Sequence, residues 1–133
     1  HCYSKILRIM IAAHHDITID RAADWSLVLT IKDAAGIPID ITSDSAYIFT
    51  GDIRNKKTKI EKLSFSFSKE SPVAPADGEI KVYLTAVNSQ KLEGCNLYEY
   101  DIFMTTASED EEPIITKTRI LEGTLTSRNN ITN

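Results

Sequence analysis

The chain has 133 residues, a hydrophobic fraction of 42% and a formal net charge of −4 at pH 7. This length suits a single domain, and the charge argues against a nucleic-acid-binding surface, because such surfaces need clustered Lys and Arg. No apolar run approaches the roughly 18 residues that a membrane-spanning helix requires.

The start of the chain is mildly apolar but unlike a targeting segment. Lys5 and Arg8 interrupt it and no basic stretch precedes it, so we expect no signal peptide. Cys2 and Cys95 have no metal-ligand spacing, and free thiols are the expectation for both. We divide the chain into an N-terminal extension (1–13), a β-sandwich domain (14–127) and a flexible C-terminal tail (128–133).

Apolar and polar residues alternate along much of the chain, which is typical of strands with one buried and one solvated face. Polar turn sequences separate these segments. Gly51, inside the strand segment 46–54, predicts a β-bulge. The clearest strand segments are 24–32 (DWSLVLTIK), 62–69 (KLSFSFSK), 78–85 (GEIKVYLT) and 97–105 (LYEYDIFMT); weaker ones are 15–20, 46–54 and 119–127. About seven short strands predict an all-β sandwich or barrel.

One stretch, residues 85–94 (TAVNSQKLEG), favours a short helical turn between two strands. Thr85 or Asn88 suits its N-cap and Gly94 its end, because Thr and Asn side chains accept from helix amides and glycine tolerates the closing conformation. Leu92 would face the core.

Two clusters have residue types that enzymes use. His14, His15 and Asp16 resemble metal ligands, but neighbouring residues of a strand point to opposite faces, so an exposed edge strand is the favoured interpretation. Glu99 and Asp101 lie two apart on the predicted solvated face, where a carboxylate pair can serve glycoside chemistry.

Other polar and aromatic features favour structural roles. The acidic run 108–113 (SEDEEP) lacks the ligand spacing of a calcium loop, and both it and the basic run 54–59 (RNKKTK) are predicted as hairpin tips. Tyr98 and Tyr100 either form a sugar-stacking platform or pack in the core, one hydroxyl bonding back to a strand corner. Core packing is favoured because Ile102 and Met104 continue the same face. We therefore predict no catalytic residues, cofactor or metal.

The order of these segments resembles the immunoglobulin-like N-terminal domain of baseplate upper proteins and related tail or fibre proteins of tailed bacteriophages. The resemblance spans about Asp16 to Thr126. It rests on the following residues in order: Asp33, Gly36, Pro38, Ile39, Asp40, Ile41 and Thr42 in one turn, Ile53 and Arg54, Asp77, Gly78 and Ile80, Leu92, Tyr98, Tyr100 and Asp101, and Leu121 and Gly123.

This resemblance implies an immunoglobulin-like antiparallel β-sandwich that acts as a non-enzymatic virion structural protein. The implied partners are other virion proteins and further copies of the chain, with trimers common in the family, and neither nucleic acid nor a membrane. The implied location is the virion, after synthesis in the host cytoplasm. The alternatives are a carbohydrate-binding or adhesion module and, third, an enzyme that uses Glu99 and Asp101 or the His14–Asp16 cluster.

Overall fold

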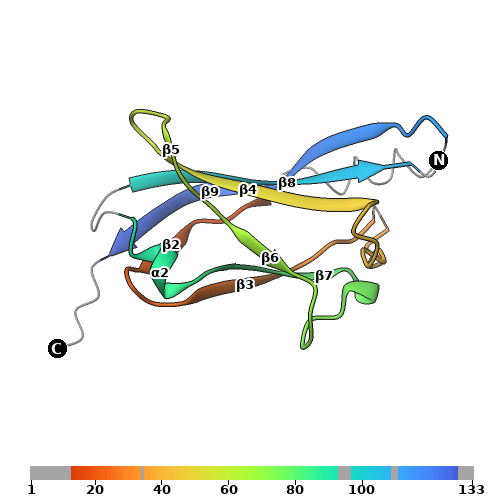
Figure 1. Ribbon diagram of the computed structural model, residues 1–133, viewed down its shortest axis with the longest axis horizontal. Coiled ribbons are helices and arrows are strands. Elements are labelled where there is room, and N and C mark those ends of the chain that lie inside the picture. Colours follow the sequence, from red (N-terminus) through yellow and green to blue (C-terminus); the bar gives the residue numbers. More distant parts are fainter. Residues whose placement is uncertain (1–12, 34, 93–96, 109–110, 129–133) are drawn as a thin grey trace.

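The computed structural model describes residues 13–33, 35–92, 97–108 and 111–128 as two β-sheets packed face to face (Figure 1). The bounds are β1 (Ala13–His14), β2 (Ile17–Asp20), β3 (Trp25–Thr30), β4 (Tyr47–Asn55), β5 (Glu61–Ser64), β6 (Ser66–Ser68), a 3-10 turn η1 (Pro75–Asp77), β7 (Glu79–Leu84), the helical turn α2 (Ala86–Ser89), β8 (Leu97–Ala107) and β9 (Ile115–Arg128). Within these described ranges no helix is long and apolar enough to cross a membrane.

The strand order confirms the predicted immunoglobulin-like sandwich. Sheet A has the order β1-β9-β8-β4-β5, with β2 also paired to β9, and sheet B has the order β3-β7-β6. β4, β8 and β9 share sheet A, as the C, F and G strands share one sheet of an immunoglobulin domain. β3, β7 and β6 share sheet B, as the B, E and D strands share the other sheet. The pairs of β1 and β2 with β9 are parallel, and the other strand pairs are antiparallel.

The apolar rows read from the sequence form the core. Tyr98, Tyr100, Ile102 and Met104 of β8 are at most 1% exposed. They face Ile80, Val82 and Leu84 of β7, which are equally buried. Burial of each such side chain contributes on the order of 1.5–3 kcal/mol, so these two rows are a substantial part of the stabilising core.

The predicted strand over residues 62–69 is two strands in different sheets. β5 pairs with β4 in sheet A, and β6 pairs with β7 in sheet B. Phe65 lies between them, and its amide donates to the Gly51 carbonyl at 2.9 Å. Leu63, Phe65 and Phe67 still point inward across this switch, because alternation depends on the backbone pleat and not on the sheet that the strand joins.

The bulge predicted at Gly51 is wrong. The register shifts lie between Ile53 and Arg54 in the β4–β5 pair and between Ile102 and Phe103 in the β8–β9 pair. A side chain at Gly51 would approach side-chain atoms of Phe65 and Ile102 at 3.0 Å. Close packing therefore explains this glycine.

The turn between β3 and β4 carries the chain from sheet B to sheet A. Gly36 has φ +83°, a conformation that glycine adopts without steric cost. Asp40 Oδ1 accepts from the amide of Thr42 at 3.0 Å and from its hydroxyl at 2.5 Å. These local bonds hold the backbone in the crossing.

The helical turn begins where the sequence indicates. Thr85 is the N-cap of α2, and its Oγ1 accepts from the amide of Asn88 at 3.3 Å. Leu92 is fully buried, as expected. The predicted end at Gly94 and the cysteines at positions 2 and 95 lie outside the described residues.

The sandwich strands reach slightly beyond the predicted domain limits of 14 and 127. β1 begins at Ala13 and β9 ends at Arg128. Both hairpin tips fall where the charge runs predict them, between β4 and β5 and between β8 and β9.

Candidate functional site

The outer face of sheet A holds the carboxylates that the sequence singles out. Arg54 of β4 lies beside Glu99 and Asp101 of β8, because Arg54 pairs in register with Glu99. Its Nε donates to Glu99 Oε2 at 3.2 Å, and its two terminal nitrogens donate to Asp101 Oδ1 and Oδ2 at 3.2 and 3.0 Å. This bidentate geometry is the strongest form of an Arg–carboxylate pair.

Asp101 departs from the expectation of a solvated face. It is only 8% exposed, because Arg54 covers it and Arg119 Nε lies 3.9 Å from its Oδ2. Lys59 Nζ binds the other oxygen of Glu99 at 2.8 Å. The hydrogen bond from Lys59, followed by that from Arg54, holds the pKa of Glu99 below its usual range. A carboxylate held ionised in this way cannot serve as a general acid near neutral pH.

The His14–Asp16 cluster lies at the junction of β1 and β2, beside these carboxylates. His14 lines a cavity of about 350 Å³ together with Glu99 and Asp101, so the fold brings together two clusters that are 85 positions apart in sequence. His14 Nε2 lies 2.9 Å from Asp16 Oδ1, which also accepts from the amide and the hydroxyl of Thr124 at 3.0 and 2.9 Å. These Thr124 bonds, ahead of His14, lower the pKa of Asp16.

The groups at the β1–β2 junction bond to neighbouring strands and hold its backbone in place. The carbonyl of His15 accepts from the hydroxyl of Tyr100, and its amide donates to the Glu122 carbonyl at 2.9 Å. Among the described residues, no group of three His, Cys, Asp or Glu side chains has the arrangement of a metal site. Both histidines are exposed at the sheet edge, which agrees with the edge-strand interpretation.

Tyr98 and Tyr100 do not form a surface platform. Each is 1% exposed, and the Tyr100 ring packs edge-on against Phe65 with centroids 5.7 Å apart. Burial raises the pKa of the Tyr100 hydroxyl, ahead of smaller contributions from nearby carboxylates. The predicted bond from a buried tyrosine to a strand corner is therefore present, with Tyr100 as its donor.

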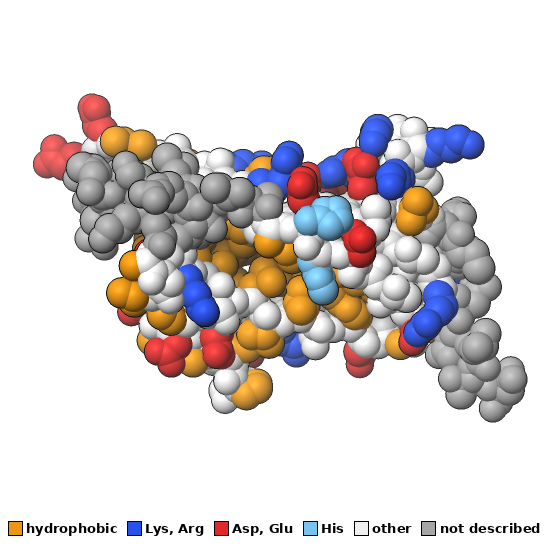
Figure 2. Space-filling view, turned by 180° about the vertical axis from the view of Figure 1, so that it is seen from behind, with side chains coloured by type: hydrophobic (Ala, Val, Ile, Leu, Met, Phe, Trp, Pro, Cys, Tyr) orange, Lys and Arg blue, Asp and Glu red, His pale blue; other side chains and the backbone are white. Residues whose placement is uncertain are grey.

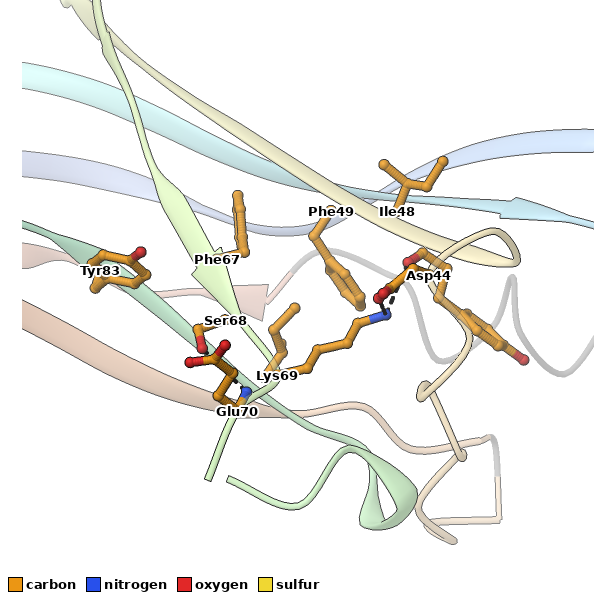
Figure 3. A pocket seen from close by; sticks show the side chains of 10 residues that line it. Asp44, Ile48, Phe49, Phe67, Ser68, Lys69, Glu70 and Tyr83 are labelled. Atoms are coloured by element: carbon orange, nitrogen blue, oxygen red, sulfur yellow. Dashed lines mark hydrogen bonds and ion pairs between the residues drawn. The ribbon is translucent and has the colours of Figure 1, made fainter. Parts of the chain in front are cut away.

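A second cavity, a cleft of about 480 Å³, opens between β4 of sheet A and β6 of sheet B (Figure 3). Of the described strands, β5 pairs with β4 only from Asp52 to Arg54, and β6 pairs only with β7. On the cleft side, Phe49 of β4 and the outer edge of β6 thus have no strand partner among the described strands. Its lining includes Tyr47, Phe49, Phe67 and Tyr83, and the rings of Phe49 and Phe67 have centroids 6.1 Å apart.

Lys69 closes one end of this cleft. Figure 3 shows its side chain extended beneath Phe49 toward Asp44. Its Nζ donates to Asp44 Oδ1 at 3.1 Å and to the carbonyls of Tyr47 and Ser43 at 3.2 and 3.3 Å, and it lies 5.8 Å from the centroid of the Phe49 ring. The ammonium group thereby occupies an edge carbonyl of β4 that a further strand would otherwise use.

Sequence reasoning missed the cleft and the role of Lys69. The only signal was the short polar stretch after the Phe65–Phe67 alternation, where Lys69 ends the run. Because the run changes sheets at Phe65, the opening between β4 and β6 depends on tertiary structure that alternation cannot specify.

Comparisons with known proteins add little to this geometry. No family model matches the sequence, and no curated protein matches it. One similar solved structure comes from a photo-crosslinking study of the multimeric cell-adhesive interactions of VGSC beta subunits. It is 12% identical, the alignment covers 92% of this chain and 96% of that one, and the TM-score is 0.42. A likeness this distant supports no inference about function.

Proposed function

We propose that this domain is a non-enzymatic protein–protein interaction module of a tailed-bacteriophage particle, and that it binds an extended polypeptide segment in the cleft between β4 and β6. The observation behind this proposal is that Phe49 of β4 and the outer edge of β6, which have no strand partner among the described strands, face one cleft lined by aromatic side chains. Exposed edges of this kind accept a further strand, a common mode of peptide recognition.

The backbone of β4 has the right groups for such pairing. The Gly51 carbonyl points toward β5, because it accepts from the Phe65 amide. Residues two apart in a strand point their backbone groups to the same side, so the amide and carbonyl of Phe49 also face the cleft. An added strand would bond to Phe49, and one of its apolar side chains would pack against Phe49 and Phe67.

The arrangement of the candidate chemical groups supports a binding role over an enzymatic one. Arg54 is shared between Glu99 and Asp101, Lys59 also pairs with Glu99, and His14 is paired with Asp16. The carbohydrate-binding alternative has less support, because the two tyrosines that would stack on a sugar are buried.

The placement in a phage particle is supported by the ordered sequence resemblance, from the turn at Asp33 to the closing strand at Gly123. A homo-oligomer, with the trimer as its specific form, and contacts with other virion proteins belong to the same proposal. Immunogold labelling of purified particles tests it: we expect label on the baseplate, fibre or head, and particles without label would contradict the phage role.

A binding experiment tests the cleft separately. Ser68 lines it, is half-buried and does not belong to the hydrophobic core, so Ser68→Arg should block the cleft and leave the core packing unchanged. The matched control is Thr30→Arg on the exposed face of β3. We expect the parent and the control to retain dissociated virion proteins in a pull-down, and Ser68→Arg to lose them. Equal retention by all three proteins would refute the role of the cleft.

A further inference from the structure

Sheet A carries opposite charges at its two ends. The β4–β5 hairpin presents Lys56 and Lys57, and the β8–β9 hairpin presents Glu111 and Glu112, all exposed. Strand β8 runs from one end to the other, and its 11 residues span roughly 33 Å at about 3.3 Å per residue. Figure 2 shows acidic side chains at one end of the molecule and Lys and Arg side chains gathered near the other.

Each charged end also exposes two large apolar residues. At the basic end Ile60 and Leu97 are 68% and 47% exposed, and at the acidic end Ile114 and Ile115 are 56% and 62% exposed. The basic end is hollowed as well: a cavity of about 430 Å³ is lined by Asn55, Lys56, Lys57 and Leu97. The two ends are thus alike in apolar character and opposite in charge.

The four charges at the ends are available to a partner. None of them forms an ion pair with another described residue, whereas the charges between them, such as Arg54 and Arg119, are paired with Asp101. At the two ends of sheet A a second molecule would therefore meet charges that no described residue pairs, and between them the paired cluster of Arg54, Arg119 and Asp101.

We propose that copies of this chain associate head to tail, with the acidic end of one molecule seated in the basic end of the next. Lys56 and Lys57 would pair with Glu111 and Glu112 of the neighbouring copy, while Leu97 and Ile60 cover its Ile114 and Ile115. Such a contact uses two different surfaces of each molecule, so it extends beyond a dimer and closes into a ring or continues as a filament according to its rotation.

The contact depends on salt. Exposed ion pairs are screened as the Debye length falls from about 30 Å at 0.01 M to about 3 Å at 1 M ionic strength. We expect sedimentation velocity of the purified full chain at about 0.01 M salt to show species larger than dimers as concentration rises. At about 1 M salt the association should weaken at least tenfold.

Charge reversal separates this contact from a general effect of net charge. E111K/E112K raises the formal net charge from −4 to zero, because each substitution adds two charges, and K56E/K57E lowers it to −8. If repulsion between net charges alone governed association, the uncharged first variant would associate more strongly than the parent and the more negative second variant more weakly. Head-to-tail contact predicts at least tenfold weaker association in both, because each variant has two ends of the same sign.

An equimolar mixture of the two variants should restore association, since one supplies two basic ends and the other two acidic ends. Asp77→Lys, an exposed charge reversal in the turn η1, which belongs to neither charged hairpin, should associate as the parent does. The inference is overturned if the parent stays monomeric at every concentration, if E111K/E112K associates as strongly as the parent, or if the mixture stays monomeric. This result is independent of the proposed cleft, because Ser68→Arg should leave self-association unchanged.

Discussion

Substitution of Gly123 by alanine should destabilise the domain more than its small size suggests. A Cβ at this position would lie 2.1 Å from the carbonyl oxygen of His15, where contacts under 3.0 Å essentially never occur. The β1–β2 junction must then move by roughly 1 Å, and overpacking of this kind costs about 1–3 kcal/mol.

The displacement also disturbs the bond that His15 accepts from Tyr100. The tyrosine is 1% exposed, and a buried hydroxyl left without its partner costs about 1–3 kcal/mol. The combined loss is about 2–6 kcal/mol, so Tm should fall by roughly 8–24 °C at roughly 4 °C per kcal/mol for a domain of this size.

Urea and thermal denaturation followed by circular dichroism measure this loss. Gly36→Ala is the control: its φ of +83° disfavours alanine, but a Cβ there meets no atom within 4 Å. We expect a loss of about 1–2 kcal/mol for the control, the usual cost of a left-handed residue. A Gly123→Ala protein as stable as the parent, or no less stable than Gly36→Ala, would refute the close approach between β9 and the β1–β2 junction.

The remaining predictions concern acid stability, the helical turn and the cleft. Because the folded state lowers the pKa of Glu99 below its usual value of 4.5, its ion pairs stabilise the fold above that pH and are lost as the pH falls through the lowered pKa. Urea midpoints should therefore drop below about pH 4.5 less steeply in Glu99→Gln than in the parent, and equal slopes would contradict this. Thr85→Ala should lower the free energy of unfolding by about 0.5–2 kcal/mol through loss of the N-cap, whereas an unchanged urea midpoint would exclude a role for that cap. Lys69→Met should remove the charge that lies beside the β4 edge and raise light scattering on concentration, because charged side chains protect exposed strand edges. Scattering equal to that of the parent would argue against this protective role.

The sequence predicts the parts of this structure that depend on local pattern. Alternation places Tyr98 and Tyr100 in the core, and the residue types of the turns place both hairpin tips. Thr85 could be predicted as a cap because its oxygen acts on an amide three residues away.

Features created by strand pairing could not be predicted from pattern alone. Asp101 occupies a polar position in β8, yet the pairing of β8 with β4 brings Arg54 over it and removes it from solvent. The same limit applies to the break between β5 and β6, because the alternation continues through Phe65 while the chain changes sheets. The cleft that follows from this break required the tertiary structure.

Hydrogen–deuterium exchange of the domain, alone and with dissociated virion proteins, tests the central claim most directly. An added strand would bond to the free edges that line the cleft, so we predict slower exchange of the amide of Phe49 in β4 and of amides in β6 (Ser66–Ser68) when the partner is present. Unchanged exchange at both edges, or protection confined to the outer face of sheet A, would contradict binding in the cleft.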